Sequence, residues 1–273
     1  MTALVTLWFW LLRRGRSGLI ALLLGTALFE LIQPLAVASL GDLSRLQALL
    51  AIVPKSFYAL MNVTPDFLMA AGLSGYLALG FTHPIYLLLS AATVIWFAGR
   101  GLAGEMERGT IQLALARPVS RPRLYLARVL GLLVVALAVA ACATLGMLAG
   151  IALSHPAGTL TYAHFVPTAL AAALLVWCIG GLALLSSATA DRMGQAVGWV
   201  SAAIVVSYVV DYFAAIWSAL EPLEPFSIFD YYNPGLALSA GTLPLTNVLV
   251  LATVGLTGAI AGLLVFARRD LPT

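Results

Sequence analysis

One carboxyl group lies in the middle of an apolar run near the N-terminus. Between residues 17 and 39, Glu30 is the one ionisable residue, and Gln33 and Pro34 follow it within about one helical turn. A proline ring clashes with the carbonyl four residues earlier, which here is that of Glu30, so a kink and an ionisable side chain coincide. Ionisable residues inside apolar helices are costly and commonly functional. Glu30, Gln33 and Pro34 therefore form a candidate site. The structural alternative is a glutamate, protonated or paired, that stabilises a contact between two such membrane chains.

A second set of charges lies in the segment 100–122, which reads RGLAGEMERGTIQLALARPVSRP. Glu105 and Glu107 precede a short apolar stretch, 110–116, and Arg117-Pro118 follows it. Acidic residues before a helix and basic residues after it complement the helix dipole. We expect a short helix that exposes charges of both signs together with apolar side chains, a surface suited to a protein partner. A solvated loop is the alternative.

The composition indicates a chain whose solvent is lipid. Of its 273 residues, 62% are apolar and only 9% are charged, whereas a soluble domain carries roughly 25% charged residues. These values exclude a soluble enzyme, a disordered protein and a free nucleic-acid binder. The 14 basic residues form no single patch, so no nucleic-acid partner is expected.

Six stretches are long and apolar enough to cross a membrane, which takes roughly 20 residues for a helix. They cover residues 17–39, 83–102, 123–154, 164–190, 193–218 and 243–267. The uncharged stretch from 129 to 190 is too long for one span, and His155-Pro156-Ala157-Gly158 breaks it into a helical hairpin. The sequence predicts an all-α integral membrane protein, with residues 1–273 as a single transmembrane domain.

The basic residues predict the orientation of these spans. Twelve of the 14 lie before span one, between or just inside spans two and three, between spans four and five, or after span six. Arg45 and Lys55 are on the other side. Because Lys and Arg accumulate on the cytoplasmic side, both termini are predicted to be cytoplasmic. Thirteen arginines against one lysine suggest a GC-rich prokaryote, and hence its cell (inner) membrane.

Three segments outside the spans have expected structures of their own. Residues 1–14 are predicted to form a helix in the cytoplasmic interface. The outer loop 40–80 is expected to carry two short amphipathic helices, of which the second begins at Thr64-Pro65-Asp66 and ends near Ala71. The other outer loop, 219–242, contains Asn233-Pro234-Gly235, a pattern typical of a turn.

Asp211 and Ser74 complete the search for reactive side chains. Asp211 lies 20 residues after Asp191, about 30 Å along a helix. We expect it at a solvated helix end, with a place on a translocation path as the second interpretation. Gly72-Leu73-Ser74-Gly75 is similar to a motif of intramembrane proteases, but only His83 is close in sequence as a base, so a turn is expected. The three histidines lack a second ligand at helical spacing, and no metal site is expected.

The segment between spans two and three carries the most specific pattern. It resembles the signature of ATP-binding-cassette (ABC) permeases of the second exporter family (ABC-2), an acidic G-E-x-x-x-G-T followed by L-x-x-R-P-x-S-R. The matching residues are Gly104, Glu105, Gly109, Thr110, Leu115, Arg117, Pro118, Ser120 and Arg121. Glu107 and Arg108 lie within the same motif. The chain length, the six spans and the large first outer loop are similar to the family as well.

The resemblance implies a division of labour between chains. Residues 103–118 would be the coupling helix, through which the permease docks a separate cytosolic ATPase. Two permeases, identical or related, and two ATPases would form an exporter, with ATP and Mg held by the ATPase. The residues agree, because the sole lysine, Lys55, follows Pro54 on the outer side and belongs to no phosphate-binding loop. We expect no enzyme activity of the chain itself. Exchange of Glu105 is expected to uncouple transport with the fold intact.

A stand-alone transporter or channel, or an intramembrane enzyme, is the alternative. A secondary transporter would favour broken helices in matching halves, and the sequence shows no such pair. In the leading interpretation, the path runs at the dimer interface along spans one, two and five. Glu30, Gln33, Pro34 and Asp211 are its candidate residues, and the apolar walls favour a hydrophobic or amphipathic substrate.

Overall fold

The computed structural model describes residues 16–39, 41, 53–61, 63–111 and 120–269. All regular elements among these residues are helices, and six are long and apolar enough to span a membrane. The spans are α2 (Arg16–Ser39), α6 (Pro84–Gly101), α9 (Arg121–Ser154), α10 (Phe165–Thr189), α11 (Met193–Ala214) and α13 (Leu245–Arg268). The predicted all-α membrane fold and its six spans are confirmed. The fifth span, α11, ends four residues before the predicted position 218.

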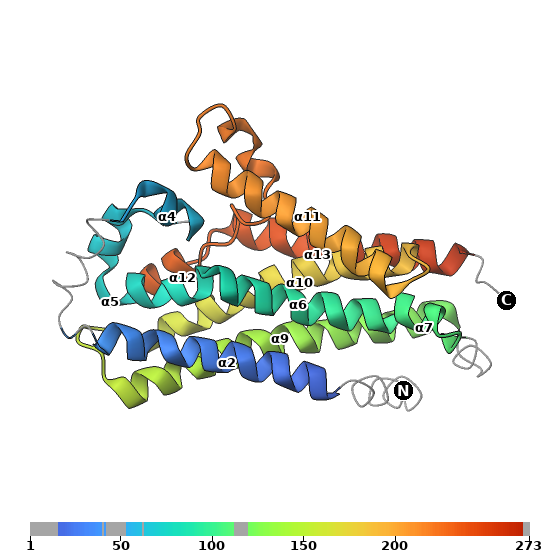
Figure 1. The fold of residues 1–273 in the computed structure, drawn as a ribbon, viewed down its shortest axis with the longest axis horizontal. Coiled ribbons are helices and arrows are strands. Elements are labelled where there is room, and N and C mark those ends of the chain that lie inside the picture. The colour runs from blue at the N-terminus through green and yellow to red at the C-terminus, as the bar shows by residue number, and fades with distance from the viewer. Residues whose placement is uncertain (1–15, 40, 42–52, 62, 112–119, 270–273) are drawn as a thin grey trace.

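Shorter helices lie at the two ends of the bundle (Figure 1). The short helix α7 lies at the end where α2 begins and α13 finishes, while α4, α5 and α12 lie at the opposite end (Figure 1). The remaining elements are α4 (Lys55–Leu60), α5 (Pro65–Thr82), α7 (Ala103–Glu107), η1 (Tyr162–His164), η2 (Glu221–Phe226) and α12 (Pro234–Ala240). An even number of spans therefore brings the beginning of α2 and the end of α13 to one side.

The break between spans three and four follows the predicted hairpin. His155 adopts a left-handed conformation with φ 47° and ψ 55°, and its N–H donates to the carbonyl of Ile151 at the end of α9. The chain then turns through Gly158, with φ 135°, and η1 leads directly into α10. The hairpin is thus set by a helix end in the left-handed region, where an L residue other than glycine is uncommon.

Two pairs of spans approach closely through glycine. A Cβ on Gly146 of α9 would lie 2.1 Å from the carbonyl oxygen of Ala27, and one on Gly150 would lie 2.3 Å from that of Leu31. The same holds for α10 and α13, where a Cβ on Gly181 would lie 2.1 Å from the carbonyl oxygen of Gly255. Small residues allow such backbone contact between membrane helices. The pairs α2–α9 and α10–α13 form the most extensive contacts among the described elements.

The segment 72–75 is not the turn that we expected. The second outer helix does begin at Pro65, with the Thr64 hydroxyl accepting from the N–H of Phe67 at 3.2 Å. Instead of ending near residue 71, however, α5 continues to Thr82 through a kink at Gly72 (φ 55°, ψ −135°). Glycine permits this conformation, and the helix resumes because Leu73 to Thr82 are apolar enough to pack inside the bundle.

The predicted turn at Asn233 is the start of a helix. Asn233 Oδ1 accepts from the N–H of Leu236 at 2.9 Å, and Pro234 occupies the first turn of α12. Asparagine at the N-cap and proline in the first turn are both favoured at the start of a helix. These residues therefore begin a helix here, although the same residue types are also typical of a turn. The predicted interfacial helix 1–14, the first outer amphipathic helix and most of the 110–116 helix lie outside the described residues.

Candidate functional site

The signature segment between α6 and α9 is fixed to the bundle by a buried ion pair. Glu105 Oε2, on α7, accepts from Arg128 Nη2, on α9, at 2.7 Å, and the two side chains are 4% and 2% exposed. Arg128 lies in a helix that is otherwise apolar around it, and its side chain packs against Gly101, where a Cβ would lie at an ordinary contact distance of 3.5 Å from Arg128 Cδ. Glu105 therefore faces the inside of the protein.

This burial revises two expectations about Glu105. Among the described residues of α7 and the turn after it, the exposed charges of both signs are Glu107 and Arg108, whereas Glu105 is buried. Removing one partner of a buried ion pair leaves an uncompensated charge and is strongly destabilising. The Arg128 Nε and Nη1 atoms, which find no acceptor among the described residues, would add to that cost. Exchange of Glu105 alone is thus expected to perturb the fold as well as coupling.

The neighbouring acid connects α7 to span five. Glu107 Oε2 accepts from the backbone N–H of Met193 at 2.9 Å, at the first residue of α11. The first N–H groups of a helix have no partner within it, and a carboxylate also interacts favourably with the positive end of the helix dipole. Glu107 therefore acts as the N-terminal cap of a helix 86 residues away, a role that the sequence did not indicate.

Ser187 connects the same segment to span four. Its hydroxyl accepts from the N–H of Ala103 at 3.0 Å and donates to the carbonyl of Ala98 at 2.8 Å. It therefore bridges α10 to the junction between α6 and α7, where the helix geometry is interrupted at Leu102 (φ −121°, ψ −67°). Two backbone groups released by that interruption are satisfied by one buried side chain.

Arg269, directly after span six (α13), adds further hydrogen bonds and an ion pair to this set of contacts. Its Nη1 atom donates to the carbonyls of Ala188 and Ala190, at 2.9 and 3.0 Å, and its Nη2 atom pairs with Asp191. Arg121 Nη1 in turn donates to the Arg269 carbonyl at 2.6 Å. Arg269 therefore holds the ends of α10 and α13 together beside α7.

The glycines of the signature have defined backbone roles. Gly109 has φ 66°, which is strained for residues with a side chain. A Cβ on Gly104 would lie 3.2 Å from the carbonyl oxygen of Gly99. The Thr110 hydroxyl donates to the Glu105 carbonyl at 3.4 Å, and Ser120 directly precedes α9. Arg117 and Pro118 lie outside the described residues.

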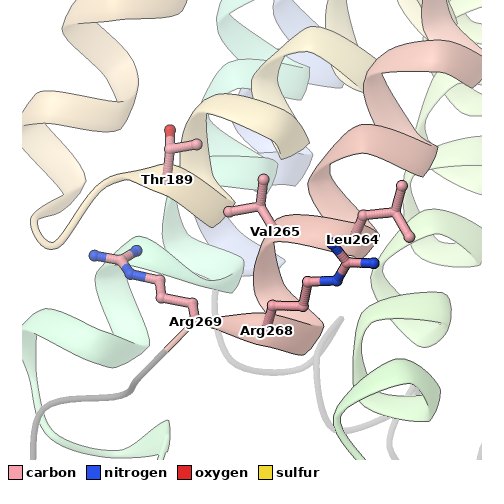
Figure 2. A pocket seen from close by; sticks show the side chains of 5 residues that line it. All are labelled: Thr189, Leu264, Val265, Arg268 and Arg269. Carbon is pink, nitrogen blue, oxygen red and sulfur yellow. The ribbon is translucent and has the colours of Figure 1, made fainter.

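A shallow cavity of about 510 Å³ opens beside this network, lined by Thr189, Leu264, Val265, Arg268 and Arg269. Figure 2 shows the two guanidinium groups pointing in opposite directions from the end of α13. Since Arg269 is engaged by α10 and Asp191, the exposed Arg268 is the charge that this hollow presents.

The intramembrane candidates occupy separate places. Glu30 and Pro34 are buried on α2, whereas Asp211 lies on α11, and both helices have α6 as a neighbour. Asp211 is 6% exposed, so the expected solvated helix end is wrong. The segment after α11 folds back over it, with the N–H of Ile228 donating to the Ser207 hydroxyl at 3.0 Å.

The protease-like motif does not form a nucleophile–base arrangement. Ser74 lies within α5, and His83 begins α6. The Nδ1 atom of His83 accepts from the N–H of Ile85 at 3.1 Å, and its ring packs on Phe29 with centroids 5.0 Å apart. His83 therefore caps a helix. Among the described residues, no cluster of side chains could hold a metal ion.

A comparison with protein families decides what the chain is. The family model described as ABC-2 family transporter protein matches residues 9–271, nearly the whole chain. The chain belongs to the ABC-2 transporter family. It is a multi-pass membrane protein and the permease component of an ABC transporter, a family whose permeases associate with an ABC ATPase. A search among proteins of curated function found no match.

Proposed function

We propose that this ABC-2 permease works as an exporter in a prokaryotic cell membrane, driven by ATP that a separate cytosolic ATPase hydrolyses. Two permeases and two ATPases form the working unit, and both termini of the permease face the cytoplasm. ATP and Mg bind the ATPase subunits. The coupling segment, 103–118, docks the ATPase at the end of the bundle that carries α7.

The observation that carries the proposal is the set of polar links around α7. Glu105 ties the segment to α9, Glu107 ties it to α11, and Ser187 ties the junction before it to α10. A displacement of the segment by a closing ATPase is therefore delivered to three spans at once, besides α6, to which α7 is directly joined. A solvated loop would transmit no such movement.

The substrate path is proposed to follow spans one, two and five. A cavity of about 430 Å³ lies between α6 and α11, with apolar walls that include Leu87, Ile95 and Val197. In the apolar parts of α2 and α11, only 17% of the residues are buried within one chain. Both helices are therefore available for contact with a second permease. The apolar lining favours a hydrophobic or amphipathic substrate.

Purification from native membranes in mild detergent tests the assignment. The wild-type permease is expected to retain a stoichiometric cytosolic ATPase, and Arg108→Glu is expected to lose it, because Arg108 is exposed within the coupling segment. Arg123→Glu is the matched control, since Arg123 is also exposed but lies on α9. An intact permease that retains no ATPase, and that transports in partner-free liposomes, would overturn the proposal in favour of a stand-alone transporter.

A further inference from the structure

The carboxyl group of Glu30 is enclosed between three helices. Its side chain is 0% exposed, and neither oxygen has a hydrogen-bond partner among the described residues. It lies against the backbone of α5, because a Cβ on Gly80 would sit 2.5 Å from Glu30 Oε2. The same Cβ would lie 2.9 Å from Gln33 Cγ and 3.0 Å from Met147 Cε, so α2, α5 and α9 meet at this point.

Two further buried polar side chains lie on α6. Tyr86 and Ser90 are both 0% exposed, and the Tyr86 hydroxyl interacts with the hydroxyls of Ser90 and Tyr232. Tyr232, from the segment before α12, is 3% exposed and donates to the carbonyl of Phe81 at 3.0 Å. The hydroxyls of Tyr86 and Tyr232 interact electrostatically with Glu30, and none of these three groups carries a positive charge.

Among the residues that the structure describes, the other titratable groups packed around this site do not neutralise Glu30. His83, at the junction of α5 and α6, directs Nδ1 to the N–H of Ile85. On α9, Arg128 is paired with Glu105 and precedes Met147 by 19 residues, about 28 Å along the helix. An ionised carboxylate without a partner is too costly to bury, and such a group takes up a proton instead.

We propose that Glu30, seated on Gly80 and near Tyr86 and Tyr232, is a proton-binding site inside the bundle, occupied in this conformation. A neutral carboxyl fits the contact between α2 and α5. When Glu30 releases its proton, the O–H bond breaks and the proton passes to water. The carboxylate that remains must also reach water, so α2 separates from α5. Pro34, one turn further along α2, cannot donate a helical hydrogen bond to the Glu30 carbonyl, which allows this separation in the outer part of the span.

Infrared spectroscopy of the permease alone tests the site, without an ATPase. In proteoliposomes at neutral pH, the wild-type spectrum is expected to contain the C=O stretch of a protonated carboxylic acid, shifted in D₂O. Glu30→Gln removes this band, because glutamine has the shape of the neutral acid and no carboxyl. Asp211→Asn, which exchanges the other buried acid lacking an ion pair among the described residues, is the matched control and keeps the Glu30 band.

A spectrum that is unchanged by Glu30→Gln would overturn the proposal. Gly80→Ala provides an independent check if the glutamine variant does not fold. Its new methyl group would press on Oε2, so the band is expected to shift, and an unshifted band would place the proton elsewhere.

Hydrogen–deuterium exchange tests the consequence for α2. Exchange in the outer half of α2 is expected to rise with pH in wild type and to be independent of carboxyl titration in Glu30→Gln. Equal pH dependence in the two proteins, after correction for intrinsic exchange chemistry, would refute the proton-controlled contact. If the chain also exports as proposed above, ATP-driven transport by Glu30→Gln loses the pH dependence of wild type. The infrared test does not involve transport, so its result supports or contradicts the proton site whatever the transport assay shows.

Discussion

Disrupting the ion pair between Glu105 and Arg128 should give a large and non-additive loss of stability. With either partner replaced alone, as in Glu105→Leu or Arg128→Met, the remaining charge stays in a site where at most 4% of either side chain is exposed. Breaking a buried pair in this way costs about 3–5 kcal/mol. At about 1.4 kcal/mol per factor of ten, the folding equilibrium constant falls by roughly two to three and a half orders of magnitude.

The double variant Glu105→Leu/Arg128→Met separates the charge from the packing. Replacing a buried pair by apolar residues of similar volume is commonly neutral or stabilising, so the double variant should be close to wild type. Arg123→Met is the control, because this exposed arginine lies on the same helix and its exchange should change stability by no more than about 0.5 kcal/mol.

Denaturant unfolding of the purified permease in detergent measures the free energy of unfolding of wild type, of the two single variants, of the double variant and of the control. The reasoning is refuted if each single substitution lowers the free energy of unfolding by less than about 1 kcal/mol. It is also refuted if the loss in the double variant equals the sum of the losses in the two single variants within about 0.5 kcal/mol. Coupled ATPase and transport assays on the double variant then ask a separate question. If the double variant is stable and its complex with the ATPase hydrolyses ATP without transport, the charge pair transmits movement in addition to holding the fold.

Three further expectations concern helix contact, capping and pH. Gly146→Ala should cost about 1–3 kcal/mol of folding stability by overpacking, because its methyl group would collide with the backbone of α2. Gly198→Ala is the control and should be nearly neutral in one chain, because a Cβ there would have nothing within 4 Å. Equal thermal stability of the two variants would contradict the contact between α9 and α2. Glu107→Ala should cost about 0.5–2 kcal/mol by removing the cap of α11, seen as faster amide exchange in its first turn; unchanged exchange there would contradict capping. Burial raises the pKa of Glu224 and of Asp230, and the charge of Asp230 adds to the effect on Glu224. Because these folded-state values are raised, their stability contribution is full below the ordinary pKa and is lost as pH rises through the raised value. Amide exchange in 219–242, corrected for intrinsic rates, should thus increase across mildly acidic pH in wild type but not in Glu224→Gln/Asp230→Asn.

The membrane spans could be predicted because they depend on local information. A run of apolar residues long enough to cross the bilayer must satisfy its backbone as a helix, and the hairpin at His155 follows from residues that stop a helix. The cap at Thr64 was also readable, because the N-cap and the first turn are adjacent in sequence. Errors arose where one local pattern serves two structures. Asn233-Pro234 can open a turn or a helix, and Gly72 can end a helix or kink it.

The partners within the candidate site could not be predicted, because they are distant in sequence. Arg128 was counted among the arginines that mark the cytoplasmic side, yet it points into the bundle towards Glu105. Its position several residues inside a predicted span was the one available signal. Glu107 caps a helix that begins 86 residues later, and no spacing rule relates the two. Asp211 is buried because a later segment folds back over it, which its distance from Asp191 could not reveal.

The glycine contacts described above divide the bundle into mechanical parts. Since α2 and α9 touch backbone to backbone, as do α10 and α13, neither pair can slide or rotate internally without opening a void or a collision. Each pair is therefore expected to move as one rigid unit, whereas α6 and α11, which have a cavity between them, can change their separation. A mechanism that opens and closes a path therefore has few places at which helices can move apart. Distances measured within either rigid unit, apart from the part of α2 beyond Pro34, should stay constant throughout a transport cycle.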